Sequence, residues 1–214
     1  MRGAGSLKDR LRMNLLHYTR GAFATLPPME APWILDIGCG SGIPTTELAR
    51  LSRGRVVGLD KDVRSLGRTR QRVGREGVTG RVGFIRGSLL FLPFRPESFQ
   101  ILWSEGSVKV IGLDRALKEW RCFLSSSGYL VVHESTSLMT SPDFPEFGYR
   151  LRQRFDIPGE VWMERYYHPL ERELEIGPPS LGDDVEELYR EIEWMRENPH
   201  DLGSTYLVLQ KFDL

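Results

Sequence analysis

The 214-residue chain is poor in the features that would assign it to a specialised class of protein. It has two cysteines, 29 basic and 29 acidic residues, and no apolar run long enough to span a membrane. Two cysteines argue against a disulfide framework. The balanced charge provides no overall field that would attract nucleic acid or a membrane surface, so neither is an expected partner.

Targeting and metal signals are also scarce. The first residues lack the apolar core of a signal peptide, and a cytoplasmic location is the default expectation. Cys39 and Cys122 do not have the spacing of metal ligands, so no metal site is expected. The length suits one domain with a full core. We expect a single domain over 1–214, with an N-terminal helix in 1–28 and the main core in 29–214.

The most informative segment is 34–42, where an apolar run ends in Gly38, Gly40 and Gly42. Such a run predicts a buried strand that leads into a tight turn, and glycine lets a ligand approach the backbone closely. Pro44 suits the first turn of a helix, so a helix is expected to begin here. Strand, turn and helix N-terminus together indicate a nucleotide site at the C-terminal edge of a parallel sheet.

The glycine turn could belong to an NAD site or to a nucleotide site of another class. The NAD fingerprint needs a third glycine where Ile43 stands, whereas here Asp36 precedes three closely spaced glycines. A second apolar run, 55–59, ends in Asp60. A carboxylate at that place can accept hydrogen bonds from both ribose hydroxyls. Because NAD enzymes use the same arrangement, Asp60 supports a ribose site without deciding between the cofactors.

The glycine spacing, with Asp36 two residues before the first glycine, resembles class I S-adenosylmethionine-dependent methyltransferases. Segments 87–94 and 97–106 are similar to the loop after the third strand and to the fourth strand of that family. Segments 103–112 and 162–170 resemble a prokaryotic branch of small-molecule methyltransferases (methyltransferase type 11), whose acceptor is not fixed.

The resemblance implies S-adenosylmethionine as cofactor, S-adenosylhomocysteine as product and a small-molecule methyl acceptor. The family usually has an acid near the adenine, but Ser88 and Leu89 occupy that stretch. Backbone groups, the Ser88 hydroxyl and stacking on Leu89 are therefore expected to bind adenine. The implied cofactor-binding residues are Asp36, Gly38, Gly40, Gly42, Asp60, Ser88, Leu89 and Ser104.

The same resemblance places the transferred methyl group across the ends of the first and fourth strands, beside Ser104 and Glu105. Glu105 is expected to be a base, an anchor for a cationic acceptor, or a buried structural acid. His133, with Glu134, ends the fifth strand, and His168 follows the sixth with two tyrosines. Each is interpreted either as an acid/base group or as packing. The catalytic candidates are Glu105, His133 and His168.

The remaining periodicity predicts an α/β fold. An N-terminal amphipathic helix is expected before Pro27, and then strands and helices alternate, which predicts parallel strands with helices on both faces. The expected strands are 33–37, 55–59, 82–87, 98–104 and 128–134, and the helices are 42–51, 62–76, 113–124 and 183–197. Resemblance adds strands 149–157 and 204–212. The whole is a Rossmann-like, seven-stranded, mostly parallel sheet with an antiparallel last strand.

Two features leave alternatives open. Segment 135–148 is short for the family and predicts an open acceptor site unless a second subunit covers it in a homodimer. Arg64, Arg68, Arg72 and Arg75 share one face of helix 62–76. This face is either solvated, an RNA-binding stripe, or a surface for self-association with the acidic segment 183–201. The alternative functions are an RNA or protein methyltransferase with an open site, and a non-catalytic cofactor-binding protein.

Overall fold

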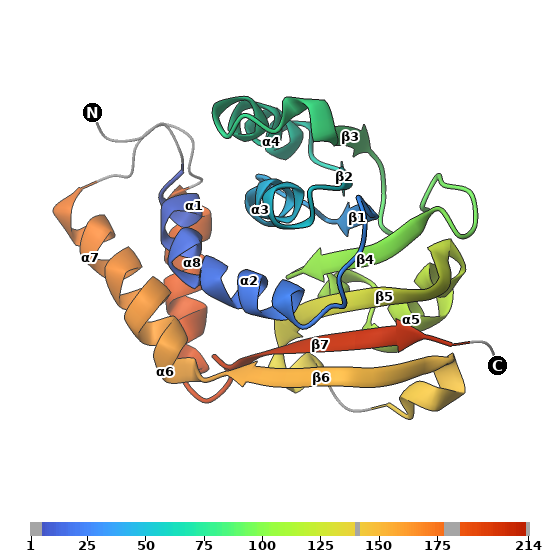
Figure 1. Ribbon diagram of the computed structural model, residues 1–214. Coiled ribbons are helices and arrows are strands. Elements are labelled where there is room, and N and C mark those ends of the chain that lie inside the picture. Colours follow the sequence, from blue (N-terminus) through green and yellow to red (C-terminus); the bar gives the residue numbers. More distant parts are fainter. Residues whose placement is uncertain (1–5, 140–141, 178–184, 213–214) are drawn as a thin grey trace.

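The computed structural model describes residues 6–139, 142–177 and 185–212. Its framework is a seven-stranded sheet in the order β3-β2-β1-β4-β5-β7-β6 (Figure 1). The strands are β1 (Trp33–Ile37), β2 (Arg55–Asp60), β3 (Val82–Arg86), β4 (Phe99–Glu105), β5 (Leu124–Ser135), β6 (Tyr149–Ile157) and β7 (Ser204–Lys211). Within these ranges, no helix is both long and apolar enough to cross a membrane.

The strand directions confirm the predicted fold class. Strand β7 lies antiparallel to β5 and β6, whereas all the pairs from β3 to β5 are parallel. The helices are α1 (Leu7–Arg12), α2 (Leu16–Ala24), α3 (Ile43–Ser52), α4 (Val63–Arg75), α5 (Leu113–Trp120), α6 (Gly159–Trp162), α7 (His168–Ile176) and α8 (Val185–Glu197). A π-helical turn, Met163–Tyr167, joins α6 to α7.

Both faces of the sheet are buried, as parallel strands require. Along β1, Leu35 and Ile37 pack into a core with α5, whereas Ile34 packs into a second core with α2, α3 and α4. Strand β4 divides in the same way, with Leu102 on the first side and Trp103 on the second. Because alternate residues of each strand pack into different cores, the face to which each side chain at the strand ends points is fixed.

A third apolar core lies beyond the strand ends and joins distant parts of the chain. It contains Leu7, Leu11 and Leu15 from the N-terminal segment, packed with residues from the π-helical turn, α7 and α8. In Figure 1, α1, α7 and α8 accordingly gather at one end of the sheet, beside α3. We call the elements α1, α2, α6, α7 and α8 the end layer.

The end layer changes the interpretation of the short segment 135–148. The described part of that segment contains only two short 3-10 turns, Thr136–Leu138 and Phe144–Phe147. However, residues from α1, α2 and α8 cover the space at the strand ends. Segments on both sides of the sheet-forming core therefore supply a wall over the strand ends within a single chain, in addition to segment 135–148.

Most predicted boundaries agree with the structure, but the start of β5 does not. Helix α5 ends at Trp120, and β5 begins at Leu124 rather than at residue 128. Leu124 is fully buried and pairs with Phe99, and β5 then has extra residues before Tyr129 pairs with Ile101. Its four-residue spacing from Trp120 fits a helix face equally well, which is why the pattern extended the helix too far.

The arginines on one face of α4 include both exposed and partly buried side chains. Arg64 and Arg75 are exposed, but the Arg72 side chain is 12% exposed and pairs with Asp9 of α1 at 3.0 Å. Arg72 also donates from Nε to the carbonyl oxygen of Ser41 in the glycine turn, at 3.1 Å. Arg72 therefore connects α4, α1 and the turn, and it is not available as part of an RNA-binding stripe.

Replacing Arg72 with glutamine should lower stability, because it leaves the shielded Asp9 carboxylate without its cation. We expect a loss of about 1–3 kcal/mol in the free energy of unfolding, or roughly 3–10 °C in Tm. Arg64→Gln, on the same helix but exposed, is the matched control and should leave Tm unchanged. Thermal unfolding followed by circular dichroism measures both variants; equal Tm values for the two would show that the Arg72–Asp9 pair is not stabilising.

Candidate active site

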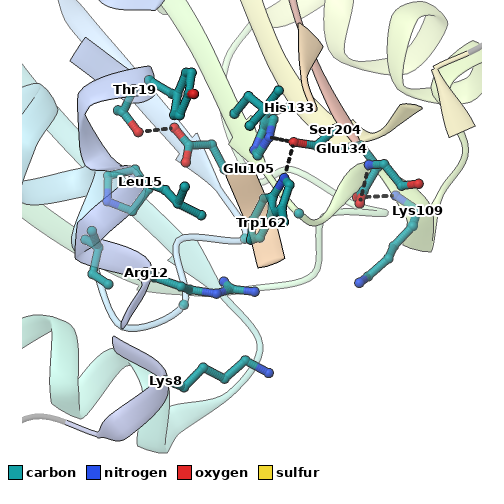
Figure 2. Close-up of a pocket in the computed structure, with 18 of the residues that line it drawn as sticks. Lys8, Arg12, Leu15, Thr19, Glu105, Lys109, His133, Glu134, Trp162 and Ser204 are labelled. Atoms are coloured by element: carbon teal, nitrogen blue, oxygen red, sulfur yellow. Dashed lines mark hydrogen bonds between the residues drawn. The ribbon is translucent and has the colours of Figure 1, made fainter. Parts of the chain in front are cut away.

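A cavity of about 590 Å³ opens where β1, β4, β5 and β7 meet the end layer (Figure 2). Its floor comes from the strand ends and the glycine turn, and its walls come from α1, α2, α8 and the segment after β6. This volume is in the range of small-molecule sites. The cavity lies at the carboxyl ends of the parallel strands, where the sequence predicts the cofactor.

The end of β2 holds the glycine turn in place. The backbone N–H groups of Gly38 and Cys39 donate to the Leu59 carbonyl oxygen at 2.8 and 3.0 Å. The N–H of Gly40 donates to Oδ2 of Asp60 at 2.9 Å, and Oδ1 of Asp60 accepts from the backbone of Asp62. Asp60 therefore orders the turn in addition to any role toward a ribose.

Gly38 and Gly40 are required for different reasons. Gly38 has a φ of 75°, and a Cβ there would lie 2.5 Å from Oγ of Ser107, so packing excludes any larger residue. Gly40 has a φ of 54° and lines the cavity, and the nearest atom to an added Cβ would be 4.0 Å away. Gly40 is thus the position at which a ligand has free approach to the backbone.

Asp36 is a buried acid beneath the cavity. It is 1% exposed and accepts a hydrogen bond from Thr45 at 2.5 Å. Burial, opposed by that hydrogen bond and reinforced by the charges of Glu105 and Asp60, raises the pKa of Asp36 to about 7. Its protonation state therefore changes near neutral pH.

Glu105 is held by neutral donors from two elements. Its Oε1 accepts from Oγ1 of Thr19 in α2 at 3.0 Å and from the indole N–H of Trp103 at 2.8 Å. Burial raises the pKa of Glu105 above its ordinary value, while the hydrogen bonds and the charge of Arg12 act against the rise. A carboxyl group with a raised pKa beside a cavity is suited to proton transfer.

His133 is enclosed by aromatic rings. Its ring stacks on Tyr206, with centroids 4.1 Å apart, and is nearly parallel to Trp162 at 6.2 Å. Its Nε2 is hydrogen-bonded to Oγ of Ser204 at 2.8 Å, and the indole N–H of Trp162 donates to the same oxygen. Burial lowers the pKa of His133 to about 3, so the ring is neutral at physiological pH.

The structure brings together only part of the predicted site. The predicted residues that line the cavity are Asp36, Gly38, Gly40, Glu105 and His133. His168 is exposed and lines a separate depression beside Met163 and Leu202, so the structure contradicts its place at the acceptor site. Tyr167, the residue before His168 and the last of the π-helical turn, lines the cavity instead.

Ser104 requires a second correction. It is fully buried, and its hydroxyl is 2.7 Å from that of Ser107, which donates in turn to the Ile37 carbonyl oxygen at 2.8 Å. Successive side chains of β4 point to opposite faces of the sheet, so Ser104 lies on the face opposite that of Glu105, which lines the cavity. The side chain therefore ties the end of β4 to β1, and it does not line the cavity.

The adenosine half of the predicted site lies outside the cavity. Asp60 and Ser88 are half-buried, and Leu89 packs partly against the core, where its carbonyl oxygen accepts from the indole of Trp120. Gly42 is the N-cap of α3, and an added Cβ would lie 2.5 Å from Thr69. The cofactor roles of these four residues stay predictions.

Sequence reasoning missed the cavity residues of the N-terminal segment and of β7. Arg12, Leu15 and Thr19 line the cavity, as do Ser204 and Tyr206. These residues belong to no motif, although the helical spacing of Leu15 with other leucines predicts a buried face. Only the packing of the end layer shows that this face covers the strand ends.

The raised pKa of Asp36 has a consequence for stability. Because the folded protein favours the protonated form, the stabilising contribution is full below the ordinary pKa of 3.8 and is lost as the pH rises through about 7. Between pH 5 and 8, the wild type should lose about 2–3 kcal/mol of unfolding free energy relative to Asp36→Asn. Denaturant unfolding across this pH range measures the difference. Asp114→Asn, an exposed acid in the first turn of α5, is the control, and a parallel pH profile for Asp36→Asn and the wild type would contradict the expectation.

Comparison with known proteins agrees with this geometry. Residues 34–128 match the family model described as a methyltransferase domain. A sterol 24-C-methyltransferase, ERG6B of Gibberella zeae, is 28% identical over 131 residues, covering 61% of this chain and 34% of that protein. The O-methyltransferase cnsE of Penicillium expansum is 30% identical over 141 residues, covering 65% of this chain and 51% of its own length. The chain thus spans about a third to a half of these curated relatives.

Solved structures show the same fold at low sequence identity. The [4+2]-cyclase SpnF superposes with a TM-score of 0.73 and 19% identity, covering 99% of this chain and 84% of that one. A putative sarcosine dimethylglycine methyltransferase from Galdieria sulphuraria also has a TM-score of 0.73, with 16% identity and coverage of 95% and 86%. One of these proteins is named a cyclase, so the fold alone does not fix the reaction. Residues 34–128 therefore resemble a methyltransferase domain, and the fold is one that methyltransferases also have, as the glycine turn predicted.

Proposed function

We propose that this protein transfers a methyl group from S-adenosylmethionine to a small-molecule acceptor. The observation that carries the proposal is the cavity that joins the glycine turn to Glu105 and His133 inside a methyltransferase domain. Related proteins support the same chemistry, since they are named sterol and O-methyltransferases. A methyltransferase from Thiobacillus denitrificans with this fold was solved with S-adenosylhomocysteine.

The residues present fit such a cofactor. Gly40 leaves room for a ligand at the turn, and Asp60 presents a half-buried carboxylate at the end of β2 for ribose hydroxyls. Asp60 still has lone pairs beyond those used by Gly40 and Asp62, because each carboxylate oxygen accepts more than one hydrogen bond. Ser88 and Leu89 would then lie on the adenine side.

The bound cofactor supplies a methyl group that its sulfonium makes electrophilic. The contribution of the protein is to hold the acceptor in line and to exclude water, which can account for most of the rate. Glu105 stands at the end of β4 with a raised pKa and can take a proton from an acceptor hydroxyl. His133 is neutral and fixed by Ser204, so it is suited to orienting the acceptor.

The enclosing end layer favours a small acceptor over RNA or protein. Lining residues from α1, α2 and α8 face the same cavity as the strand ends, and a macromolecule would have to displace them. The Arg72–Asp9 pair also removes one arginine from the stripe that an RNA would contact. The cytoplasmic location, the possible homodimer and the prokaryotic branch stay predictions.

Calorimetry tests cofactor binding. S-adenosylhomocysteine should bind to the wild type, whereas NAD should not. Asp60→Ala should weaken S-adenosylhomocysteine binding about ten- to a hundredfold, because it removes a charged acceptor worth roughly 1.5–3 kcal/mol. Asp62→Ala, which removes the neighbouring helix-capping carboxylate, is the control and should bind almost normally. Binding of NAD without any response to S-adenosylhomocysteine would overturn the proposal.

Glu105→Gln tests catalysis separately from binding. The amide keeps the size of the side chain but cannot accept a proton, so turnover per folded molecule should fall on the order of a hundredfold or more. S-adenosylhomocysteine affinity should change little, since Asp60 is on the other side of the turn. Transfer of labelled methyl from S-adenosylmethionine into fractionated cell extract provides the assay, and label in RNA or protein would favour the alternative acceptors. Unchanged turnover in the variant would make Glu105 a structural acid.

A further inference from the structure

An arginine without an acidic partner points into the cavity. Arg12 is the last residue of α1, and Figure 2 shows its side chain extending into the space below Trp162. The residue remains exposed although it lines the cavity. Among residues 6–139, 142–177 and 185–212, no carboxylate lies within 4.0 Å of its guanidinium.

The acids around Arg12 are engaged by other groups. Glu187 and Glu191 of α8 pair with Lys8 at 2.9 and 2.7 Å. Asp9 accepts from Arg72 and from the Ser41 hydroxyl. Glu105 accepts from the neutral donors described above. Burial opposes the charge of Arg12, but the Tyr166 hydroxyl and the charges of Glu191 and Asp9 outweigh it and raise the pKa of Arg12. Neither carboxylate lies at ion-pair distance.

The charge of Arg12 acts on the groups at the strand ends. It lowers the pKa of Glu105, against the larger effect of burial, and it lowers the pKa of His133 together with burial. Both groups lie at the ends of β4 and β5, on the side of the cavity away from Asp60. An anion bound by Arg12 would therefore lie beside the residues assigned to the acceptor.

The wall above Arg12 is apolar and largely aromatic. Its lining residues are Leu15, Leu16, Tyr18, Trp162, Tyr167 and Trp194. Aromatic and aliphatic side chains of this kind bind the apolar body of a ligand, and a few fixed polar groups orient it. Trp162 is held by its hydrogen bond to Ser204, so the aromatic part of the wall is ordered before a ligand binds.

We propose that Arg12 anchors an anionic group, a carboxylate or a phosphate, at one end of an otherwise apolar methyl acceptor. The inference rests on the proposed function and names the class of acceptor. The planar guanidinium offers two parallel N–H donors that match either anion, and an unpaired cation in a partly enclosed site gains most from such a partner. Lys8, Lys109 and Arg190 also line the cavity, but Lys8 is paired with Glu187 and Glu191. Arg12 is the cation whose charge acts on both Glu105 and His133, so it lies nearest to the residues assigned to the acceptor.

The test uses simple amphiphiles on protein saturated with S-adenosylhomocysteine. Octanoate and octyl phosphate carry the proposed anion, and octanol is the neutral match. Tryptophan fluorescence reports binding, because Trp162 and Trp194 line the cavity. The wild type should bind both anions at least tenfold more tightly than octanol. Arg12→Gln should remove this preference, with a loss of about ten- to a hundredfold for the anions and little change for octanol.

Two further variants control the result. Arg10→Gln makes the same change on the same helix, at a residue that pairs with Glu173 outside the cavity, and should keep the preference for anions. Arg12→Lys keeps the positive charge but lacks the planar guanidinium, so it should keep part of the preference for anions. Equal binding of octanoate and octanol by the wild type, or a preference that persists in Arg12→Gln, would overturn the inference.

Measuring S-adenosylhomocysteine affinity distinguishes an acceptor anchor from a cofactor contact at Arg12. S-adenosylhomocysteine affinity should differ by less than about twofold between Arg12→Gln and the wild type. A loss of S-adenosylhomocysteine binding in the variant would assign Arg12 to the carboxylate of the cofactor and would also overturn the inference. If the wild type itself did not bind S-adenosylhomocysteine, the proposed function would fail, which is a different result from a lack of anion preference.

Discussion

The attachment of the glycine turn to the end of β2 is the constraint on which the site depends. The Leu59 carbonyl oxygen and the Asp60 carboxylate accept from three consecutive backbone N–H groups, those of Gly38, Cys39 and Gly40. These bonds hold the turn in a conformation with positive φ at Gly38 and Gly40, which few other residues adopt. The parallel register of β1 with β2 and β4 then brings this turn next to Glu105 at the edge of the sheet.

The end layer depends on the same turn. Asp9 of α1 accepts from the Ser41 hydroxyl within the turn and from Arg72 of α4, so one carboxylate joins the layer to two elements of the sheet-forming core. Further along, Thr19 donates to Glu105. The acid assigned to catalysis is therefore also a contact between the layer and β4. A change in the protonation of Glu105 would alter this contact, so the chemistry of the site and the position of its cover are linked.

The sequence was sufficient for the sheet because its signals are local. The apolar runs of β1 and β4 and the glycines after β1 depend only on neighbouring residues, and the predicted strand bounds agree with the structure to within four residues. The cavity walls could not be predicted in this way, because they depend on where α1 and α8 pack after distant parts of the chain meet. Ser104 and His168 also could not be placed from the sequence. Each is next to a residue that lines the cavity, but the backbone geometry points its own side chain elsewhere.

Burial gives the site an electrostatic balance that neither charge count nor motif reveals. Asp36 and Glu105 both have raised pKa values, so in the protein alone each favours its neutral form more than an exposed acid does. A positively charged sulfonium near them would favour ionisation, since a nearby opposite charge lowers the pKa of an acid. Arg12 has the opposite preference and favours an anion. The cavity therefore offers separate positions for a cationic and an anionic group, which matches transfer from a sulfonium to an acceptor that carries negative charge away from the reacting atom.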